Sequence, residues 1–243
     1  MRRSRKKKMA DQGGSYKASA HPAVEGLVRV CGLPPAPARS LSELIGPIER
    51  YPAAAVVSSI APAPRLKWIL SGWTCEMRVL PDGRRQIFSF ALPGDPVLSR
   101  PVNAANPCSV VALTAVECID VAQTLARAKD ADRTEISRAM NHALNLAQER
   151  RYEDIIRLGR RSALQRLADM LLELHDRLAQ IGLVDERGFY LPLTQEHLAD
   201  ALGLSVVHVN RSLKTLRLDG LATFRFGRVT QIDRERLAEM CRA

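Results

Sequence analysis

The clearest pattern of hydrophobic positions along the chain lies in residues 193–219. A first helix is predicted after Thr194, which is a favourable N-cap. Its apolar face consists of Leu198, Ala199 and Leu202. Gly203 follows where a tight turn needs a positive φ, and Ser205 is the next N-cap. The second predicted helix extends to about Leu218, with an apolar face formed by Val209, Leu213 and Leu216.

The outer face of this second helix carries hydrogen-bond donors and few acids: Val206, Val207, His208, Asn210, Arg211 and Lys214. The following segment GLATFRFGRVTQID predicts a two-stranded wing, with Phe224 and Phe226 on one side and Gly227-Arg228 at the turn. A plain αα-hairpin would also show two amphipathic helices. The spacing of a small residue (Ala199), a turn glycine (Gly203) and a buried valine (Val209) favours a helix-turn-helix, whose second helix enters the DNA major groove.

A different period marks the middle of the chain. Apolar residues alternate with polar ones from Trp73 to Val79 and again at Phe88, Phe90 and Leu92, with a turn signal at 81–83. This predicts a β-hairpin with one buried face. Residues 96–107 are expected to form a loop, and 109–113 and 116–121 two further strands. Short strands at this spacing indicate a small barrel or β-roll.

The stretch before the hairpin holds eight of the fourteen prolines, between Pro22 and Pro64. Such a density disfavours long helices and central strands. We expect irregular structure with short edge strands there, together with one short helix over residues 41–48. Residues 1–20 are expected to be a disordered basic tail.

From about Thr124 the period becomes helical, with a narrow apolar seam: Ile136, Met140, Ala143 and Ala147. A narrow seam on a long helix is typical of pairing with a second copy, although a core helix within one chain is the alternative. Gly159 can break or kink the chain. A broad amphipathic helix then follows over residues 162–181 and ends at Gly182.

These elements predict an α+β protein with three ordered parts. The expected division is a disordered tail over residues 1–20, a β-roll domain over 21–125, a dimerisation helix over 126–158 and a winged helix-turn-helix domain over 159–243.

Composition narrows the classes of function. The chain has 243 residues, with 46% hydrophobic and 26% charged residues, which is an ordinary globular balance. No apolar run reaches the roughly 18 residues that cross a bilayer, and the basic start lacks the apolar segment of a secretory signal. We therefore expect a cytoplasmic protein without a membrane partner. The formal charge is +10, and the tail cations supply six units of it: Arg2, Arg3, Arg5, Lys6, Lys7 and Lys8. The tail either adds non-specific phosphate contacts or only aids solubility.

Sequence signatures of catalysis, metals and cofactors are missing. The five cysteines are scattered and odd in number, which argues against a disulfide framework, a structural zinc site or an iron–sulfur cluster. No G-x-S-x-G, HExxH, P-loop or GxGxxG occurs in its required context. The acid pair Glu153-Asp154 is interpreted as part of a solvated helical face. We expect no enzymatic activity, no metal and no cofactor.

In its order of parts the chain resembles the Crp/Fnr superfamily of bacterial transcription factors. The resemblance covers about residue 68 to the C-terminus and rests on three stretches: LSGWTCEMRVLPDGRRQIFSFALPGD, LGRRSALQRLADMLLEL and LPLTQEHLADALGLSVVHVNRSLKTLRLDGLATFRFGRVTQID. It implies a cyclic-nucleotide-binding-like β-roll, a dimer helix and a winged helix-turn-helix. The implied function is transcription regulation through double-stranded DNA by a homodimer on a twofold operator, with RNA polymerase as a further candidate partner.

The sensor departs from the nucleotide-binding members. Their ribose-binding Gly-Glu pair corresponds to Leu98-Ser99 here, and the place of their phosphate-binding arginine, near 106–109, has none. Arg100 is close but does not match that position. Without the cation, the charge-assisted bonds to a cyclic phosphate are lost. We expect no control by cyclic AMP, and the effector stays unknown.

The resemblance also assigns DNA contacts. Arg211 matches a base-reading position, where a guanidinium can bond guanine O6 and N7. Val206, Val207 and His208 are the other base-reading candidates, with the valines suited to thymine methyl groups. The phosphate candidates are Thr194, Ser205, Ser212, Lys214 and Arg228. The alternative function is an architectural DNA-binding protein with little sequence preference, for which the basic tail is the best argument.

Overall fold

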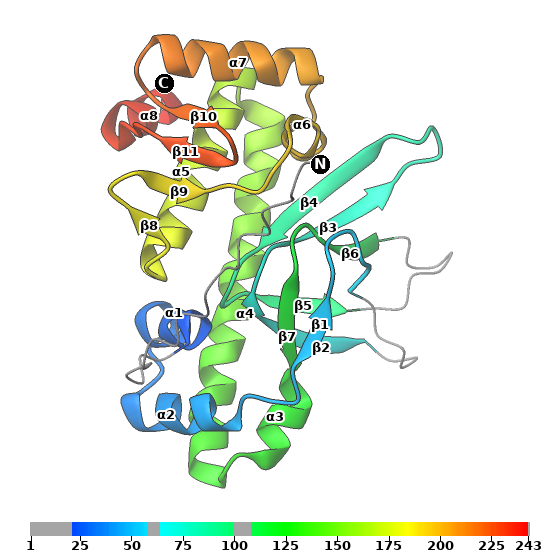
Figure 1. Cartoon of the computed structure of the whole chain (residues 1–243), viewed down its shortest axis with the longest axis vertical. Helices are drawn as coiled ribbons and strands as arrows, with labels where there is room; N and C mark the ends of the chain where they lie inside the picture. Colours follow the sequence, from blue (N-terminus) through cyan, green and yellow to red (C-terminus); the bar gives the residue numbers. More distant parts are fainter. Residues whose placement is uncertain (1–20, 58–63, 100–107, 243) are drawn as a thin grey trace, which may run out of the picture.

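The computed structural model describes residues 21–57, 64–99 and 108–242. The predicted basic tail, Arg100 and Asn106 lie outside these residues. Helix α4 is the long axis of the molecule, with a β-roll on one side, two N-terminal helices against its lower end and a winged helix domain at its upper end (Figure 1). The structure therefore has the α+β architecture expected from the sequence.

Two sheets form the β-roll. One has the strand order β1-β7-β2-β5 and the other β4-β3-β6, and all their pairings are antiparallel. The strands are β1 (Glu49–Tyr51), β2 (Arg65–Ser71), β3 (Thr74–Val79), β4 (Arg85–Ala91), β5 (Pro96–Ser99), β6 (Cys108–Ala112) and β7 (Val116–Asp120). Strand β5 corrects part of the loop expected over 96–107, because residues 96–99 pair with β2.

The β3–β4 hairpin differs from strict alternation at one point. Glu76 pairs with Ser89 and Met77 pairs with Ile87, so Phe88 is the extra residue of a β-bulge. The bulge exchanges the two faces of β4: Ile87 and Phe90 are buried, whereas Phe88 is exposed. Val79 is also exposed, so the prediction that the hairpin buries one whole face is wrong for Phe88 and Val79.

The N-terminal segment is helical, which corrects the irregular structure expected for it. Helix α1 (Pro22–Cys31) and helix α2 (Pro35–Leu44) each begin with a proline at the first helical position. A proline there loses no intrahelical hydrogen bond and has a suitable φ, so the prolines begin these helices instead of blocking them. The short helix expected over 41–48 is likewise wrong, because α2 ends at Leu44.

Helix α4 (Asp130–Arg160) follows the short helix α3 (Val121–Arg127) and continues through Gly159 without a break. Its apolar seam packs inside its own chain. Ile136, Met140 and Ala143 are buried in a cluster with α1, α2 and β2, and Ala147 is half-buried. Helices α1 and α2 cover Ile136, Met140 and Ala143, which corrects their predicted pairing with a second copy, whereas the pairing of Ala147 stays a prediction.

The C-terminal part contains α5 (Ala163–Gln180), β8 (Val184–Asp185), β9 (Gly188–Tyr190), α6 (Gln195–Leu202), α7 (Val206–Leu218), β10 (Thr223–Arg225), β11 (Arg228–Thr230) and α8 (Arg234–Arg242). Strands β10, β11, β9 and β8 form one antiparallel sheet in that order. Ser162 caps α5 through a reciprocal capping box with Gln165. None of the described helices is long and apolar enough to cross a membrane.

Candidate nucleic-acid interface

Helices α6 and α7 form the helix-turn-helix expected from the sequence. The Thr194 side chain accepts a hydrogen bond from the His197 amide and begins α6, while the Ser205 side chain accepts from the His208 amide and begins α7. Gly203 between them has φ +61°, the left-handed region that favours glycine. Ala199 and Val209 are buried where the two helices cross. Caps, turn and buried contacts together fix the angle at which α7 is presented.

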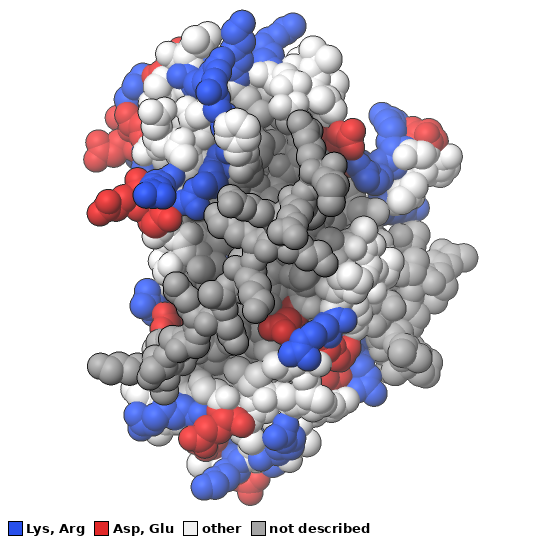
Figure 2. Space-filling model, in the orientation of Figure 1, with Lys and Arg blue, Asp and Glu red and all other residues white. Residues whose placement is uncertain are grey.

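The outer face of α7 is open to solvent. Val206, Val207, His208, Arg211 and Lys214 are all exposed, and Val207 is 67% exposed. Basic side chains gather along the top of the molecule over α7 (Figure 2). An exposed helix with cations and small apolar groups on one face can enter the major groove of DNA.

His208 has a defined orientation on this face. Its Nδ1 lies 2.9 Å from the Ser205 hydroxyl, so the ring turns back over the start of α7. This contact leaves Nε2 as the ring nitrogen that can bond a base or a phosphate.

Two of the predicted phosphate contacts are placed unfavourably. Ser212 is only 6% exposed, because it lies on the inner face of α7, and its prediction is corrected. The Arg228 guanidinium donates to Asp185 at 2.7 Å and to the Gly188 carbonyl, which directs it toward the β8–β9 hairpin. Thr194, Ser205 and Lys214 remain exposed.

The wing also differs from its sequence prediction. Phe224 is half-buried against the core of the domain, whereas Phe226 is fully exposed and lies in the turn with Gly227. The two phenylalanines therefore do not share one side. The turn predicted at Gly227-Arg228 is one residue too late, because Arg228 pairs with Arg225 in the sheet and Phe226 occupies the tip with Gly227.

The predicted nucleotide position in the β-roll offers no ionic group among the described residues. Leu98 on β5 is partly exposed, and the buried Ser99 hydroxyl donates to the Val57 carbonyl at 3.1 Å. The five cysteines are unpaired, and burial raises the pKa of Cys75 and of Cys118 to about 11. These two thiols stay protonated at neutral pH.

Comparison with known proteins identifies the family to which this helix-turn-helix belongs. Residues 165–240 match the model of the Crp-like helix-turn-helix domain. The transcriptional activatory protein AadR of Rhodopseudomonas palustris is 31% identical over 218 residues, which cover 85% of each chain. The chain belongs to the Crp/Fnr family.

Other relatives agree with this assignment. The nitrogen fixation regulation protein FixK of Bradyrhizobium diazoefficiens is 29% identical over 175 residues, covering 72% of this chain and 73% of that protein. The structure of FixK2 from Bradyrhizobium japonicum superposes with a TM-score of 0.63 at 24% identity, covering 81% of this chain and 97% of that one, and shows the same fold. The protein is a DNA-binding transcription regulator of the Crp/Fnr type.

A group of ion pairs around the buried Arg157 and the half-buried Arg150 and Arg177 fixes the DNA-binding domain of this Crp/Fnr protein to its sensor. Arg157 on α4 is 4% exposed and donates to Asp169 and Glu173 on α5, both at 2.6 Å, and to Asp154 on its own helix. Arg177 on α5 bonds Glu173 at 2.9 Å. Arg157 therefore joins α4 to two successive turns of α5.

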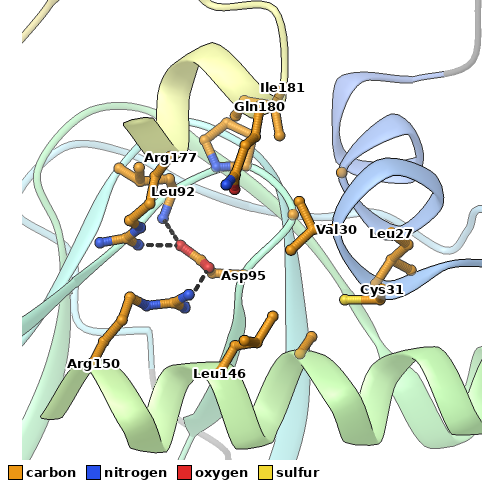
Figure 3. Close-up of a pocket in the computed structure, with 14 residues that line it drawn as sticks. Leu27, Val30, Cys31, Leu92, Asp95, Leu146, Arg150, Arg177, Gln180 and Ile181 are labelled. Atoms are coloured by element: carbon orange, nitrogen blue, oxygen red, sulfur yellow. Dashed lines mark hydrogen bonds and ion pairs between the residues drawn. The ribbon is translucent and has the colours of Figure 1, made fainter. Parts of the chain in front are cut away.

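Asp95, in the turn between β4 and β5, extends this group into the β-roll. Its carboxylate accepts from Arg177 at 2.5 Å and from Arg150 of α4 at 2.8 Å, and it also accepts from the Leu92 amide. Figure 3 shows both guanidinium groups pointing at the one carboxylate. A cavity of about 50 Å³ adjoins the site, between α1, the β4–β5 turn, α4 and α5.

The group was missed in the sequence, where Asp154 was interpreted as part of a solvated face. Its signal is nevertheless present. Residues 150, 154 and 157 on one helix and 169, 173 and 177 on the next each recur at helical spacing, with both charge signs on each helix. Spacing alone could not show that the two charged stripes face each other.

The pKa values of two carboxyl groups in this cluster are shifted in opposite directions. Burial alone would raise the pKa of Glu173, but Arg177 and Arg157 lower it below the usual range. Burial raises the pKa of Asp154 to about 6 although Arg157 opposes this, and the Glu173 and Asp169 charges add to the rise. Glu173 is thus stabilised as an anion, whereas the folded protein disfavours the Asp154 anion.

Replacing Arg157 with methionine should lower the free energy of unfolding by up to about 3–5 kcal/mol, because Asp169 and Glu173 would each lose one of their two cations inside the protein. Urea denaturation measures the change. Arg84→Met, which removes an exposed ion pair with Asp82, is the matched control and should leave the midpoint unchanged. Equal midpoints for the two variants would contradict the assignment.

The two carboxyl groups should also differ in their dependence on pH. Between about pH 4 and pH 6 the folded protein holds a proton on Asp154 that the unfolded chain has lost, so the contribution of this group to stability falls as the pH rises. Asp154→Asn should remove that fall without lowering stability at pH 7. The lowered pKa of Glu173 has the opposite sign, so Glu173→Gln should lower stability at pH 7, with the deficit shrinking in acid. Urea titrations from about pH 3 to pH 7.5 distinguish the two, because the Glu173 effect lies below its usual pKa and the Asp154 effect above its own.

Proposed function

We propose that this regulator binds a twofold-symmetric DNA operator as a homodimer, with α7 of each subunit in the major groove and Arg211 as the main base-reading residue. The observation that carries the proposal is the exposed outer face of α7. Regulators of the Crp/Fnr family bind DNA as dimers, which supports the twofold target. RNA polymerase is the partner through which we expect a bound dimer to act on transcription.

Position and exposure support the roles of individual side chains on α7. Arg211 is exposed in the second turn of the helix, and a guanidinium there can bond guanine in a bidentate manner. The neighbouring Val206 and Val207 can pack on thymine methyl groups. We assign phosphate contacts to Lys214 and to the two caps, Thr194 and Ser205, because phosphates bind readily at helix N-termini. His208 is assigned to a base or phosphate through Nε2.

The dimer surface that we propose is the face of α4 opposite α1 and α2. Tyr152, Ile155 and Ile156 form an exposed apolar patch near the end of the helix, and Ile155 is 66% exposed. Toward the start of α4 the exposed face continues as polar residues, among them Asn141 and Asn145. An apolar stripe with a few amides is typical of paired helices, in which amides specify the register.

The sensor that we propose does not respond to cyclic AMP. Leu98 supplies no polar group, and Ser99 is already bonded to a backbone carbonyl. We assign no effector. An architectural role is the weaker alternative, because α7 has a defined outer face suited to reading bases.

Arg211→Ala should weaken binding to the preferred operator by about 1–3 kcal/mol and relax the preference at one position of each half-site. Mobility-shift titrations of a randomised half-site measure both effects. Lys214→Ala is the matched variant on the same helix. It should weaken binding to all sequences alike and reduce the slope of log affinity against log salt by about one. An Arg211→Ala protein that retains wild-type preference would contradict the base contact.

Ile155→Glu should convert the dimer into a monomer, since two carboxylates would face each other across the paired helices. Sedimentation equilibrium measures the state, and operator affinity should fall with it. Val79→Glu adds the same charge at an exposed apolar residue of the β3–β4 hairpin and should leave the dimer intact. Dissociation by Val79→Glu, or none by Ile155→Glu, would place the interface elsewhere.

A further inference from the structure

The tip of the wing carries an aromatic residue that the fold does not require. Phe226 is fully exposed, the extreme among the large apolar side chains in the described part of the chain. Its φ is +50° and that of Gly227 is +71°, so both central residues of the two-residue turn are left-handed. Such a type I′ turn favours Asn-Gly and is unfavourable for a bulky side chain. Neither burial nor turn geometry accounts for phenylalanine at this place.

The turn is held firmly beside the helix-turn-helix. The Leu191 amide donates to the Gly227 carbonyl at 2.7 Å, and residues 191–194 lead directly into α6. Val229 of β11 is completely buried and pairs with Phe189 of β9. Strand β10 contacts α7, and the two lie next to each other in Figure 1. Phe226 therefore projects from a fixed point of the part that carries α6 and α7.

The surroundings of Phe226 combine aromatic and cationic groups. Arg225 is exposed immediately before it, and the turn itself contains no acid. Tyr190 is half-exposed, and its ring lies against Gly227, 3.4 Å from where a Cβ would stand. The nearby Asp185 is already paired with Arg228. Exposed aromatics beside Arg225, which has no ion pair with the described residues, match a surface that presents phosphates beside apolar sugar edges.

We propose that the wing tip binds the DNA minor groove flanking each half-site, with Phe226 against the edge of a base step and Arg225 on an adjacent phosphate. The proposal rests on the DNA-binding function of α7. Apolar side chains in the minor groove partly unstack the step they contact, and pyrimidine–purine steps yield most easily. Phe226 is thus a specificity-determining residue for base pairs that α7 does not reach.

The test compares full-length wild type with Phe226→Asn, which removes the ring and installs the preferred Asn-Gly turn. Binding sites are selected from DNA that is randomised in both half-sites and flanks, and affinities are then titrated. Phe226→Asn should lower affinity for the selected operator about tenfold and flatten the flanking preference, as for loss of one specific base-pair contact. Its half-site preference should stay as in wild type. Phe226→Trp should retain the flanking preference.

Two controls separate the possible outcomes. On an operator shortened to remove the flanks, wild type and Phe226→Asn should bind equally. The thermal midpoint of Phe226→Asn should be unchanged or higher, which excludes unfolding as the cause of weaker binding.

The proposal is overturned if Phe226→Asn keeps wild-type affinity and flanking preference. It is also overturned if DNA binding is intact but transcription with purified RNA polymerase is lost, because the tip would then contact protein. Arg211→Ala serves as the comparator. If Arg211→Ala changes the half-site preference and Phe226→Asn has no effect, only the wing contact is refuted. If neither variant has an effect, the base-reading role of α7 is refuted as well.

Discussion

The placement of the DNA-binding domain depends on three arginines, one buried and two half-buried, whose ion pairs connect three parts of the chain. Arg157 binds two carboxylates of α5 from α4, and Asp95 of the β-roll accepts from both Arg150 and Arg177. If α5 rotated away, Arg157 would lose the two carboxylates of Asp169 and Glu173, and Arg177 would lose Asp95. The penalty for an unpaired buried charge is large, so the ion pairs specify one orientation more strongly than they add stability. Apolar packing accompanies them, because Phe90 and Leu92 share a cluster with the core of the winged domain.

The two N-terminal helices decide which face of α4 is available to a partner. They cover Ile136, Met140 and Ala143, three residues of the apolar seam that the sequence predicts for pairing with a second copy. The remaining face is polar near its start and apolar near its end, close to the ion pairs. Pairing of two α4 helices through that end would bring the two attachments of α5 near the twofold axis. The separation of the two α7 helices would then depend directly on the angle between α4 and α5.

The sequence predicts those parts of the fold and of the site that depend on interactions between residues close together in the chain. The helix-turn-helix was predicted nearly residue by residue, because caps at Thr194 and Ser205, the turn at Gly203 and the apolar spacing are all local signals. The N-terminal helices were missed because proline density was weighed without the position of each proline, and Pro22 and Pro35 stand where proline favours a helix. The bulge at Phe88, the burial of Ser212 and the pairing of Arg157 with α5 depend on which surfaces meet. That information is not contained in the periodicity of one segment.

A twofold operator imposes a strict geometric condition on these contacts. Recognition helices must stand about one turn of DNA apart, roughly 34 Å, so a small change in the angle of α5 moves α7 out of register. Apolar packing alone is non-directional and tolerates sliding between α5 and the β-roll. Ion pairs made by planar guanidinium groups do not, since their hydrogen bonds require fixed directions. Asp95, Arg150 and Arg177 therefore hold the angle of α5, because the sensor, α4 and α5 meet at one carboxylate.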